Sequence, residues 1–162
     1  MERQVRRIVR YIKENKVEEE LLSCYLIEGQ GMELDKHADG SDQQLSVIGS
    51  CGRAWIQQQE RKGFCFKKCK ENLCLEGSLQ NLTIGSRIVV GDAIIEITSN
   101  EKSCYPDLCE LKEKDIQTKC LLQQEFRFAK VIKSGQVISF NHIIWYSNVT
   151  IGNGEKNGIN TY

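Results

Sequence analysis

This chain of 162 residues has little proline and histidine, and its net charge is zero. It has one proline and two histidines, and its 22 basic side chains balance 22 acidic ones. A balanced charge provides no overall field to collect nucleic acid or an anionic membrane, although it leaves room for local patches. No run reaches the ~18 apolar residues of a membrane span. The opening "MERQVRRIVRYIKENK" interleaves arginine with single apolar residues, unlike a signal peptide. We therefore expect one cytoplasmic domain with no membrane segment.

Cysteine, in contrast, is enriched, with eight residues. The proportion stays below the ~8–10% typical of short secreted disulfide scaffolds, and in a reducing compartment the thiols should be free. Three roles are then open for each cysteine: a small buried apolar residue, a metal ligand or a reactive thiolate. Burial is the commonest of the three, so a reactive role needs a further argument.

Turn signals between β-branched runs predict strands in the second half of the chain. Two such runs, Arg87–Val90 and Ala93–Thr98, flank Gly91-Asp92, and a glycine in the first turn position suits a type II′ hairpin. A second pair of strands is expected in "FRFAKVIKSGQVISF", with Ser134-Gly135 as the break, and "NHIIWYSNV" follows as a further strand. Short strands with regular turns are typical of a barrel or a sandwich.

The first segment gives two conflicting signals. Val5, Ile8, Val9 and Ile12 are spaced as on one face of a helix, whereas "VRRIVRYI" is β-branched enough for a strand that mixes its faces. Periodicity alone predicts a helix here.

A helix is also expected from Cys51 to Arg61, because this stretch lacks β-branched runs. Ser50 can act as its N-cap, and Gly63 can end it. The tail from Gly152 holds three glycines and little to bury, so we expect it to be mobile.

The order of several motifs resembles one known family. The motifs are "GMELDKHADG", "QQLSVI", "KENLCLEG", "LTIGSRIVVGDAIIEITSNEKSC" and "FAKVIKSGQV". Together they resemble the MOSC domain, the C-terminal domain of molybdenum cofactor sulfurases, and in particular its small stand-alone bacterial members. The resemblance implies a mainly β fold, a closed MOSC-type barrel similar to the pyruvate kinase barrel, with a few short helices. It also implies that Gln4–Ile12 is the first barrel strand, and that residues 1–150 form one domain before a tail at 151–162.

Cys104 is the working residue that the resemblance implies. The family's activity, in molybdenum cofactor or sulfur handling, is centred on one cysteine after the central hairpin, and Cys104 holds that place. A cysteine carries a persulfide or ligates molybdenum only as a thiolate, so its pKa must be lowered by a cation, a helix N-terminus or the metal. Thiolate also matches the soft ligands that molybdenum prefers. Lys102 can supply a positive charge to Cys104 only if the two side chains lie on the same face of the chain. Pro106 is expected to shape the loop that presents Cys104.

Cys109 and Cys120 look like counterparts of further cysteines in the small bacterial members. Three thiols near one site can bind a metal, or one can resolve a persulfide or sulfenate formed on another. The alternative, that Cys109 and Cys120 only fill space, stays open.

The resemblance also implies a set of cofactor-binding residues. Asp35 and His37 occupy positions where the family has an acid and a histidine in a glycine-rich loop, and Gln44 is the glutamine of the "QQLSVI" motif. Glu71 and Asn72 look like the family's acid-amide pair. Such a pair either hydrogen-bonds the edge of a pterin ring or closes a turn. His37 is equally well read as a satisfied structural residue.

The chain departs from the family pattern where an anion would be held. Gln43 stands in place of an arginine, and Gln123 and Gln124 fall where a Pro-Arg-Glu-Gly run is expected. Glutamine supplies neither the charge nor the guanidinium fork of arginine. Arg127 is a possible replacement, but on a strand it would face the other side.

Two other readings concern the segment before the "KENLCLEG" motif. Cys51, Cys65, Cys69 and Cys74 can be counted as four zinc ligands, but they lack the paired Cys-x2-Cys spacing of zinc sites, so zinc is not favoured. The run "RKGFCFKKCK" mixes basic residues with phenylalanines, as in some single-stranded nucleic-acid sites. A solvated connection between helix and strand explains it better.

Three functions are therefore weighed. The first is a barrel that binds molybdenum cofactor (molybdopterin) or a sulfur-bearing intermediate at Cys104, with a cysteine desulfurase or a molybdoenzyme as partner. The second is a non-catalytic binding or scaffold module on the same barrel, and the third is a structural zinc protein. Pyridoxal phosphate belongs to the desulfurase part of larger family members, since no lysine here has a convincing Schiff-base setting. Whether the chain is an enzyme stays open.

Overall fold

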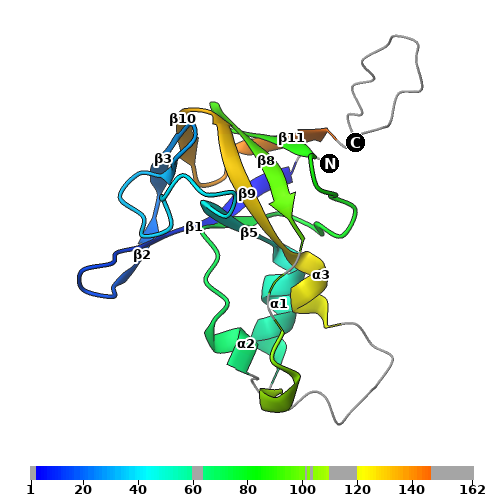
Figure 1. Ribbon diagram of the computed structural model, residues 1–162. Coiled ribbons are helices and arrows are strands. Elements are labelled where there is room, and N and C mark those ends of the chain that lie inside the picture. The colour runs from blue at the N-terminus through cyan, green and yellow to red at the C-terminus, as the bar shows by residue number, and fades with distance from the viewer. Residues whose placement is uncertain (1–2, 60–63, 101, 103, 110–119, 147–162) are drawn as a thin grey trace.

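The computed structural model describes residues 3–59, 64–100, 102, 104–109 and 120–146. The strands gather at one end of the molecule and the helices at the other (Figure 1). In the described part of the chain, no helix has the length and apolarity needed to cross a membrane. The predicted mobile tail, the domain limit at residue 150, and Arg61 and Gly63 at the expected helix end lie outside the described residues.

Seven strands form a closed mixed barrel, as expected from the resemblance. Their order is β11-β7-β8-β9-β5-β6-β1, and β1 pairs with β11 to close the ring. Among the described strands only β5 and β6 run parallel, and β2 extends the sheet from β1. The strands are β1 (Arg3–Tyr11), β2 (Glu18–Leu21), β5 (Leu45–Gly49), β6 (Leu73–Leu75), β7 (Arg87–Val90), β8 (Ala93–Ser99), β9 (Phe126–Lys133) and β11 (His142–Tyr146).

The first segment is a strand, so the helix suggested by its periodicity is wrong. Its register against β6 shifts between Val5 and Arg7, and Ile8 and Val9 are both buried beyond this irregularity. A bulge places two successive side chains out of simple alternation. The helix-like spacing of apolar residues therefore comes from an irregular strand with buried positions on both faces.

The hairpin of β7 and β8 matches its prediction. Val90 pairs with Ala93 across the turn, and Gly91 adopts φ +58° while Asp92 does not have a positive φ. A type II′ turn requires a positive φ at its first central residue only. A side chain at Gly91 would also lie 2.5 Å from the carbonyl oxygen of Gln136.

The second predicted pairing, between the strands on either side of Ser134-Gly135, is wrong. The break at Ser134-Gly135 exists, but the strand after it, β10 (Gly135–Ile138), pairs with β3 (Ser23–Ile27) instead of returning along β9. β3 also pairs with β4 (Gly31–Met32), which completes a separate three-stranded sheet. A Cβ on Gly135 would lie 2.3 Å from the carbonyl carbon of Asp92, so glycine lets this strand begin against the β7–β8 turn.

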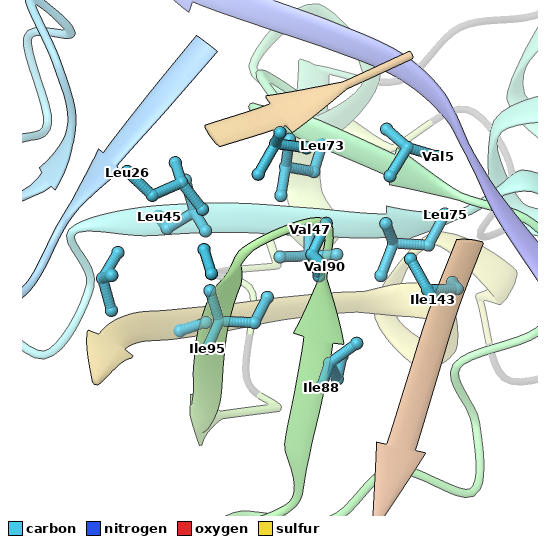
Figure 2. Close-up of a cluster of buried hydrophobic side chains, with 14 of the residues drawn as sticks. Val5, Leu26, Leu45, Val47, Leu73, Leu75, Ile88, Val90, Ile95 and Ile143 are labelled. Carbon is cyan, nitrogen blue, oxygen red and sulfur yellow. The ribbon is translucent and has the colours of Figure 1, made fainter. Parts of the chain in front are cut away.

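The interior of the barrel is filled by aliphatic side chains from most of its strands (Figure 2). Each is removed from water at a gain of roughly 1.5–3 kcal/mol. The residues labelled there are Val5, Leu26, Leu45, Val47, Leu73, Leu75, Ile88, Val90, Ile95 and Ile143. The barrel is thus a packed core, and any reactive site must lie at its ends or outside it.

The helices cover one end of the barrel through a second apolar cluster that includes Ile48, Ile56, Phe66, Leu122 and Phe126. They are α1 (Ser50–Gln58), α2 (Phe64–Lys67) and α3 (Leu121–Glu125), with the short 3₁₀ segment η1 (Pro106–Leu108). The expected helix is confirmed as α1, but its N-cap is not Ser50.

The residue at the cap of α1 is Gly49, which makes no side-chain capping bond. The Ser50 hydroxyl instead accepts a hydrogen bond from the N–H of Gly77 at 2.9 Å. This bond ties α1 to the loop after β6.

Candidate functional site

Asp35, which follows β4, lies at the centre of a buried polar network. Its Oδ1 accepts a hydrogen bond from the backbone N–H of His37 at 2.8 Å and lies 2.9 Å from His37 Nδ1. Its Oδ2 accepts from the N–H of Tyr11 at 2.7 Å and from Asn72 Nδ2 at 2.9 Å. Burial opposes ionisation of Asp35, but the His37 ring and these N–H groups outweigh it and lower its pKa. Asp35 is a buried carboxylate, joined to the surface by the partly exposed His37.

Asn72 is fully buried and its carboxamide is fully occupied. Besides Asp35, Nδ2 donates to the carbonyl of Val9 at 3.1 Å, while Oδ1 accepts from the N–H and the hydroxyl of Ser46 at 3.1 and 3.0 Å. A carboxamide has two donor hydrogens and two acceptor lone pairs. The arrangement therefore ties β1, β5 and the loop before β6 together, and a cofactor-binding role for Asn72 stays a prediction.

Gln44 has a similar structural position. It is buried, its Nε2 donates to the carbonyl of Ser41 at 2.7 Å, and its Oε1 accepts from the N–H of Val131 at 3.0 Å. These bonds join the loop before β5 to β9. A ligand-binding role for Gln44 stays a prediction.

Glu71 is a buried carboxylate between two arginines. Its Oε1 lies 3.1 Å from Arg7 Nη1 and 3.2 Å from Arg53 Nη1, and its side chain is 1% exposed. The thiol of Cys69 lies 4.0 Å from Oε2. The carboxylate is thus held by a strand and by α1, and its predicted contact with a cofactor would have to displace one of these partners.

Cys104 lies in the loop between β8 and η1, and its side chain is exposed. It hydrogen-bonds with the thiol of Cys65 on α2, and the charges of Cys109 and Cys120 act on its titration. We call Cys65, Cys104, Cys109 and Cys120 the four-thiol group. Cys109 and Cys120 thus lie within electrostatic range of Cys104, and Cys65, which was not predicted at this site, does so too; the catalytic roles of these residues stay predictions.

The pKa of Cys104 is raised, which is opposite to what a stabilised thiolate requires. Partial burial is the largest cause, and the neighbouring thiols add to it. Lys102 does not correct this, because its ammonium donates to the carbonyl of Lys68 at 3.3 Å and lies 4.5 Å from the centre of the Phe126 ring. At neutral pH Cys104 is therefore mainly a protonated thiol.

The four cysteines counted as zinc ligands do not share one environment. Cys51 is exposed at the start of α1, and Cys65 belongs to the four-thiol group. Cys69 and Cys74 are buried beside Glu71, and burial raises the pKa of each to about 12. Among the described residues, no group of three or more His, Cys, Asp or Glu side chains is arranged to hold a metal ion.

A hollow of about 460 Å³ lies beside the loop that leads to Cys104. It is lined by Gln80, Asn100, Gln123, Gln124 and Arg127. Gln123 Nε2 donates to the carbonyl of Lys102 at 3.1 Å, which ties this amide-lined pocket to the Cys104 loop. The two glutamines that replace the expected Pro-Arg-Glu-Gly run thus line a pocket of neutral carboxamides.

Arg127 is the one cation among the described residues that line this pocket, and its guanidinium is hydrogen-bonded to backbone carbonyls. It is buried, and each of its nitrogen atoms donates to main-chain oxygens at 2.7–3.3 Å. The acceptors are the carbonyls of Leu79, Gln80, Leu82, Gln124 and Phe126. With its five N–H donors engaged in this way, Arg127 cannot hold an anion in the pocket without losing these bonds.

The Asp35 network and the four-thiol group are separate, and residues 68–72 run between them. Lys68 lies 5.2 Å from the ring centre of Tyr105, next to Cys104, whereas Lys70 lies 5.5 Å from the ring centre of Tyr11 in the Asp35 network. Phe66, from the run read as a possible nucleic-acid site, is buried against Trp55 with ring centres 5.5 Å apart. It is therefore not available to stack on a base.

Comparisons with known proteins agree on the fold. No family model matches the sequence, and no curated protein matches it. Among solved structures, YuaD from Bacillus subtilis aligns with a TM-score of 0.63 at 16% identity, over 88% of this chain and 94% of that chain. YiiM from Escherichia coli aligns with a TM-score of 0.54 at 21% identity, over 92% and 71% of the two chains. YiiM from Geobacillus stearothermophilus gives 0.55 at 14% identity, over 91% and 74%.

The fold is a MOSC-type barrel. At these identities the likeness establishes the architecture, and the chemistry must be argued from the residues of this chain. The MOSC-type barrel accounts for the strand order that local signals missed, including the separate pairing of β10 with β3.

Cys65 is the member of the thiol group that sequence reasoning placed elsewhere. Its spacing to Cys69 and Cys74 suggested a local zinc group, but α2 and the loop after β8 bring it to Cys104. No local pattern links Cys65 to Cys104, because they are separated by the whole β6–β8 segment of the MOSC-type barrel.

Proposed function

We propose that this protein is a sulfur carrier built on a MOSC-type barrel, with the thiol of Cys104 as the acceptor. The observation that supports this proposal best is an exposed cysteine that shares a hydrogen bond with Cys65 and lies within electrostatic range of two further thiols. Most single buried cysteines only fill space, but a group of thiols with one exposed member suits acceptance and release of sulfur. A cysteine desulfurase is the class of partner that would supply it.

In the proposed loading step, the thiolate of Cys104 attacks the terminal sulfur of a persulfide on the donor. The new bond joins that sulfur to Cys104, the donor's S–S bond breaks, and the donor leaves as a thiolate. The raised pKa of Cys104 makes this attack slow at neutral pH and faster in alkali, because only the deprotonated form is nucleophilic. A partner that withdraws the proton on docking would remove this limit.

Cys65 is placed to resolve the product. Its thiolate can attack the Cys104 sulfur of the persulfide, which forms a Cys65–Cys104 disulfide and releases hydrosulfide. Cys65 already hydrogen-bonds with Cys104, whereas Cys109 and Cys120 act on Cys104 through their charge. This favours Cys65 over the two cysteines first expected in the role.

Molybdenum cofactor is a weaker fit than sulfur. When bound, it would supply a redox-active metal with soft sulfur ligands, and the exposed Cys104 thiol would suit that metal. The amide-lined pocket would offer hydrogen bonds to a ring edge, but Arg127 is occupied by carbonyls, so the described lining holds no free cation for an anionic arm. We therefore place molybdenum cofactor second, as a possible acceptor of the sulfur.

The test is the content of cyanide-releasable sulfur in the full chain, purified without oxygen and incubated with a cysteine desulfurase and cysteine. The wild type and Cys51→Ser should load sulfur equally, because Cys51 is exposed but is not among the thiols that perturb Cys104. Cys104→Ser should lose the sulfur. Equal loading of the wild type and Cys104→Ser would reject the proposal, and elemental analysis of the same samples would detect molybdenum.

A non-catalytic binding module is the alternative to both sulfur and cofactor chemistry, and the occupied Arg127 and Asn72 side chains favour it. In that case these side chains would serve the fold through structural bonds and take no part in chemistry. It predicts that Cys104→Ser leaves both partner binding and stability unchanged and that no molybdenum is present. Stoichiometric molybdenum in the wild type would exclude it.

A further inference from the structure

A second hollow, of about 280 Å³, lies at the side of the barrel where β1 turns into β2. Its lining carries four positive charges and no acidic side chain. The lining residues are Tyr11, Ile12, Lys13, Lys16, Val17, Lys36 and Lys70. We call it the four-lysine pocket.

The lysines come from three segments that the backbone holds in place. Lys13 and Lys16 sit on the β1–β2 turn, which is closed by a hydrogen bond from the N–H of Ile12 to the carbonyl of Val17 at 2.9 Å. The N–H of Lys36 donates to the carbonyl of Tyr11 at 2.8 Å. The carbonyl of Lys70 accepts from the hydroxyl of Ser46 at 2.8 Å. The backbone hydrogen bonds of the fold therefore bring the three lysine-bearing segments to one place.

Lys16 occupies a conformation that a lysine rarely adopts. Its φ is +55°, in the left-handed region, where a residue with a Cβ is disfavoured by roughly 1–2 kcal/mol and glycine is preferred. Strained residues of this kind cluster at functional sites, where the side chain is needed despite the strain.

The charge of the pocket is not neutralised from within the described part of the chain. The ammonium groups of Lys36 and Lys70 lie 5.7 and 5.5 Å from the centre of the same Tyr11 ring. Burial raises the pKa of the Tyr11 phenol, so it stays neutral, and it donates to the carbonyl of Glu71. No ion pair of these lysines is found among the described residues.

Most acids nearby are already engaged by an arginine or a histidine. Glu71 is held by Arg7 and Arg53, Glu18 also by Arg7, and Asp35 by His37. Glu14 lies on the same turn and lines a neighbouring hollow that Lys13, Asp35 and Lys36 also line, but it forms no ion pair with these lysines among the described residues. Four like charges around one cavity repel each other, and a bound anion would relieve that repulsion.

We propose that the four-lysine pocket binds the phosphate group of a small ligand. Lysine acts on phosphate as a point charge with three donors, and several lysines suit a multivalent anion better than a carboxylate. The volume is at the lower end of small-molecule sites, so it suits a phosphate with a short attached group. This site does not involve Cys104, and it is independent of the proposed sulfur chemistry.

Isothermal titration calorimetry of the full chain with pyrophosphate, at low ionic strength, tests the proposal. The double variant Lys36→Gln, Lys70→Gln should raise the dissociation constant about tenfold or more. A matched control, Lys130→Gln with Lys133→Gln on β9, removes the same charge elsewhere and should change it by less than about twofold. Absence of saturable binding in the wild type, or an equal loss in both double variants, would overturn the proposal.

Three further measurements define the ligand and the role of the strained residue. Tighter binding of glycerol phosphate than of inorganic phosphate would support an ester as the ligand, and equal binding would support the free ion. Lys16→Gly should weaken pyrophosphate binding while raising the midpoint of urea unfolding, because it removes both a charge and the backbone strain. Cys104→Ser should leave pyrophosphate binding unchanged, which separates this site from the sulfur proposal.

Discussion

Replacing Asn72 by alanine should destabilise the protein strongly, because its carboxamide joins three segments of the barrel. The substitution removes hydrogen bonds to the carbonyl of Val9, to the carboxylate of Asp35, and from two groups of Ser46. A neutral hydrogen bond contributes about 1 kcal/mol and one to a charged group about 2 kcal/mol. The expected loss is therefore about 3–5 kcal/mol of unfolding free energy, depending on whether water enters the space.

Urea denaturation of the full chain, followed by circular dichroism, measures this loss. Asn100→Ala is the matched control, since Asn100 is an exposed residue beyond the end of β8, and its effect should stay within about 0.5 kcal/mol. A loss below about 1 kcal/mol for Asn72→Ala would refute the structural role. It would mean that the carboxamide is free for a ligand, as the family resemblance first suggested.

The remaining predictions concern the packing of two glycines, the stability of the protein in acid and the exposure of two thiols. Gly135→Ala should prevent or severely weaken folding, because its Cβ would meet backbone atoms of the β7–β8 turn. Gly29→Ala has open space around it and should cost only about 1–2 kcal/mol, from its positive φ. Thermal melts of the two variants measure the difference. Since the pKa of Asp35 is lowered from its ordinary 3.8, its ionised form stabilises the fold above that pH and the contribution is lost as pH falls below it, so Asp35→Asn should flatten the acid side of a stability–pH curve. A thiol reagent at pH 8 should modify exposed Cys104 well before buried Cys74, whose pKa is about 12, and mass spectrometry of timed samples would reveal the reverse order.

Local signals in the sequence predicted the parts of the fold that depend on neighbouring residues. The β7–β8 hairpin follows from Gly91-Asp92 between two β-branched runs, and α1 follows from a stretch without them. These local signals failed where the pairing of a strand depends on segments far away in the sequence. The break at Ser134-Gly135 was visible, but its strand partner, β3, lies more than a hundred residues earlier.

The family resemblance corrected the first strand, which periodicity alone would have made a helix. The candidate site was only partly predictable for the same reason. Asp35 and Asn72 were named separately, yet their direct hydrogen bond, and the bonds that occupy Asn72, come from the meeting of three segments. The grouping of Cys65 with Cys104 and the convergence of four lysines likewise have no local pattern.

The seam between β1 and β11 has a consequence for how the chain is made. The barrel closes where Arg3 pairs with Ile143 and Gln4 with His142. The first strand therefore completes its pairing only after the last strand has been synthesised. During synthesis, β7 and the first residues of β1, Arg3 and Gln4, lack their β11 partner until residue 146 has emerged, and unpaired edges favour association with other chains. Slow, concentration-sensitive refolding from denaturant is the behaviour that this ring closure favours, since distant pairing is late and entropically costly.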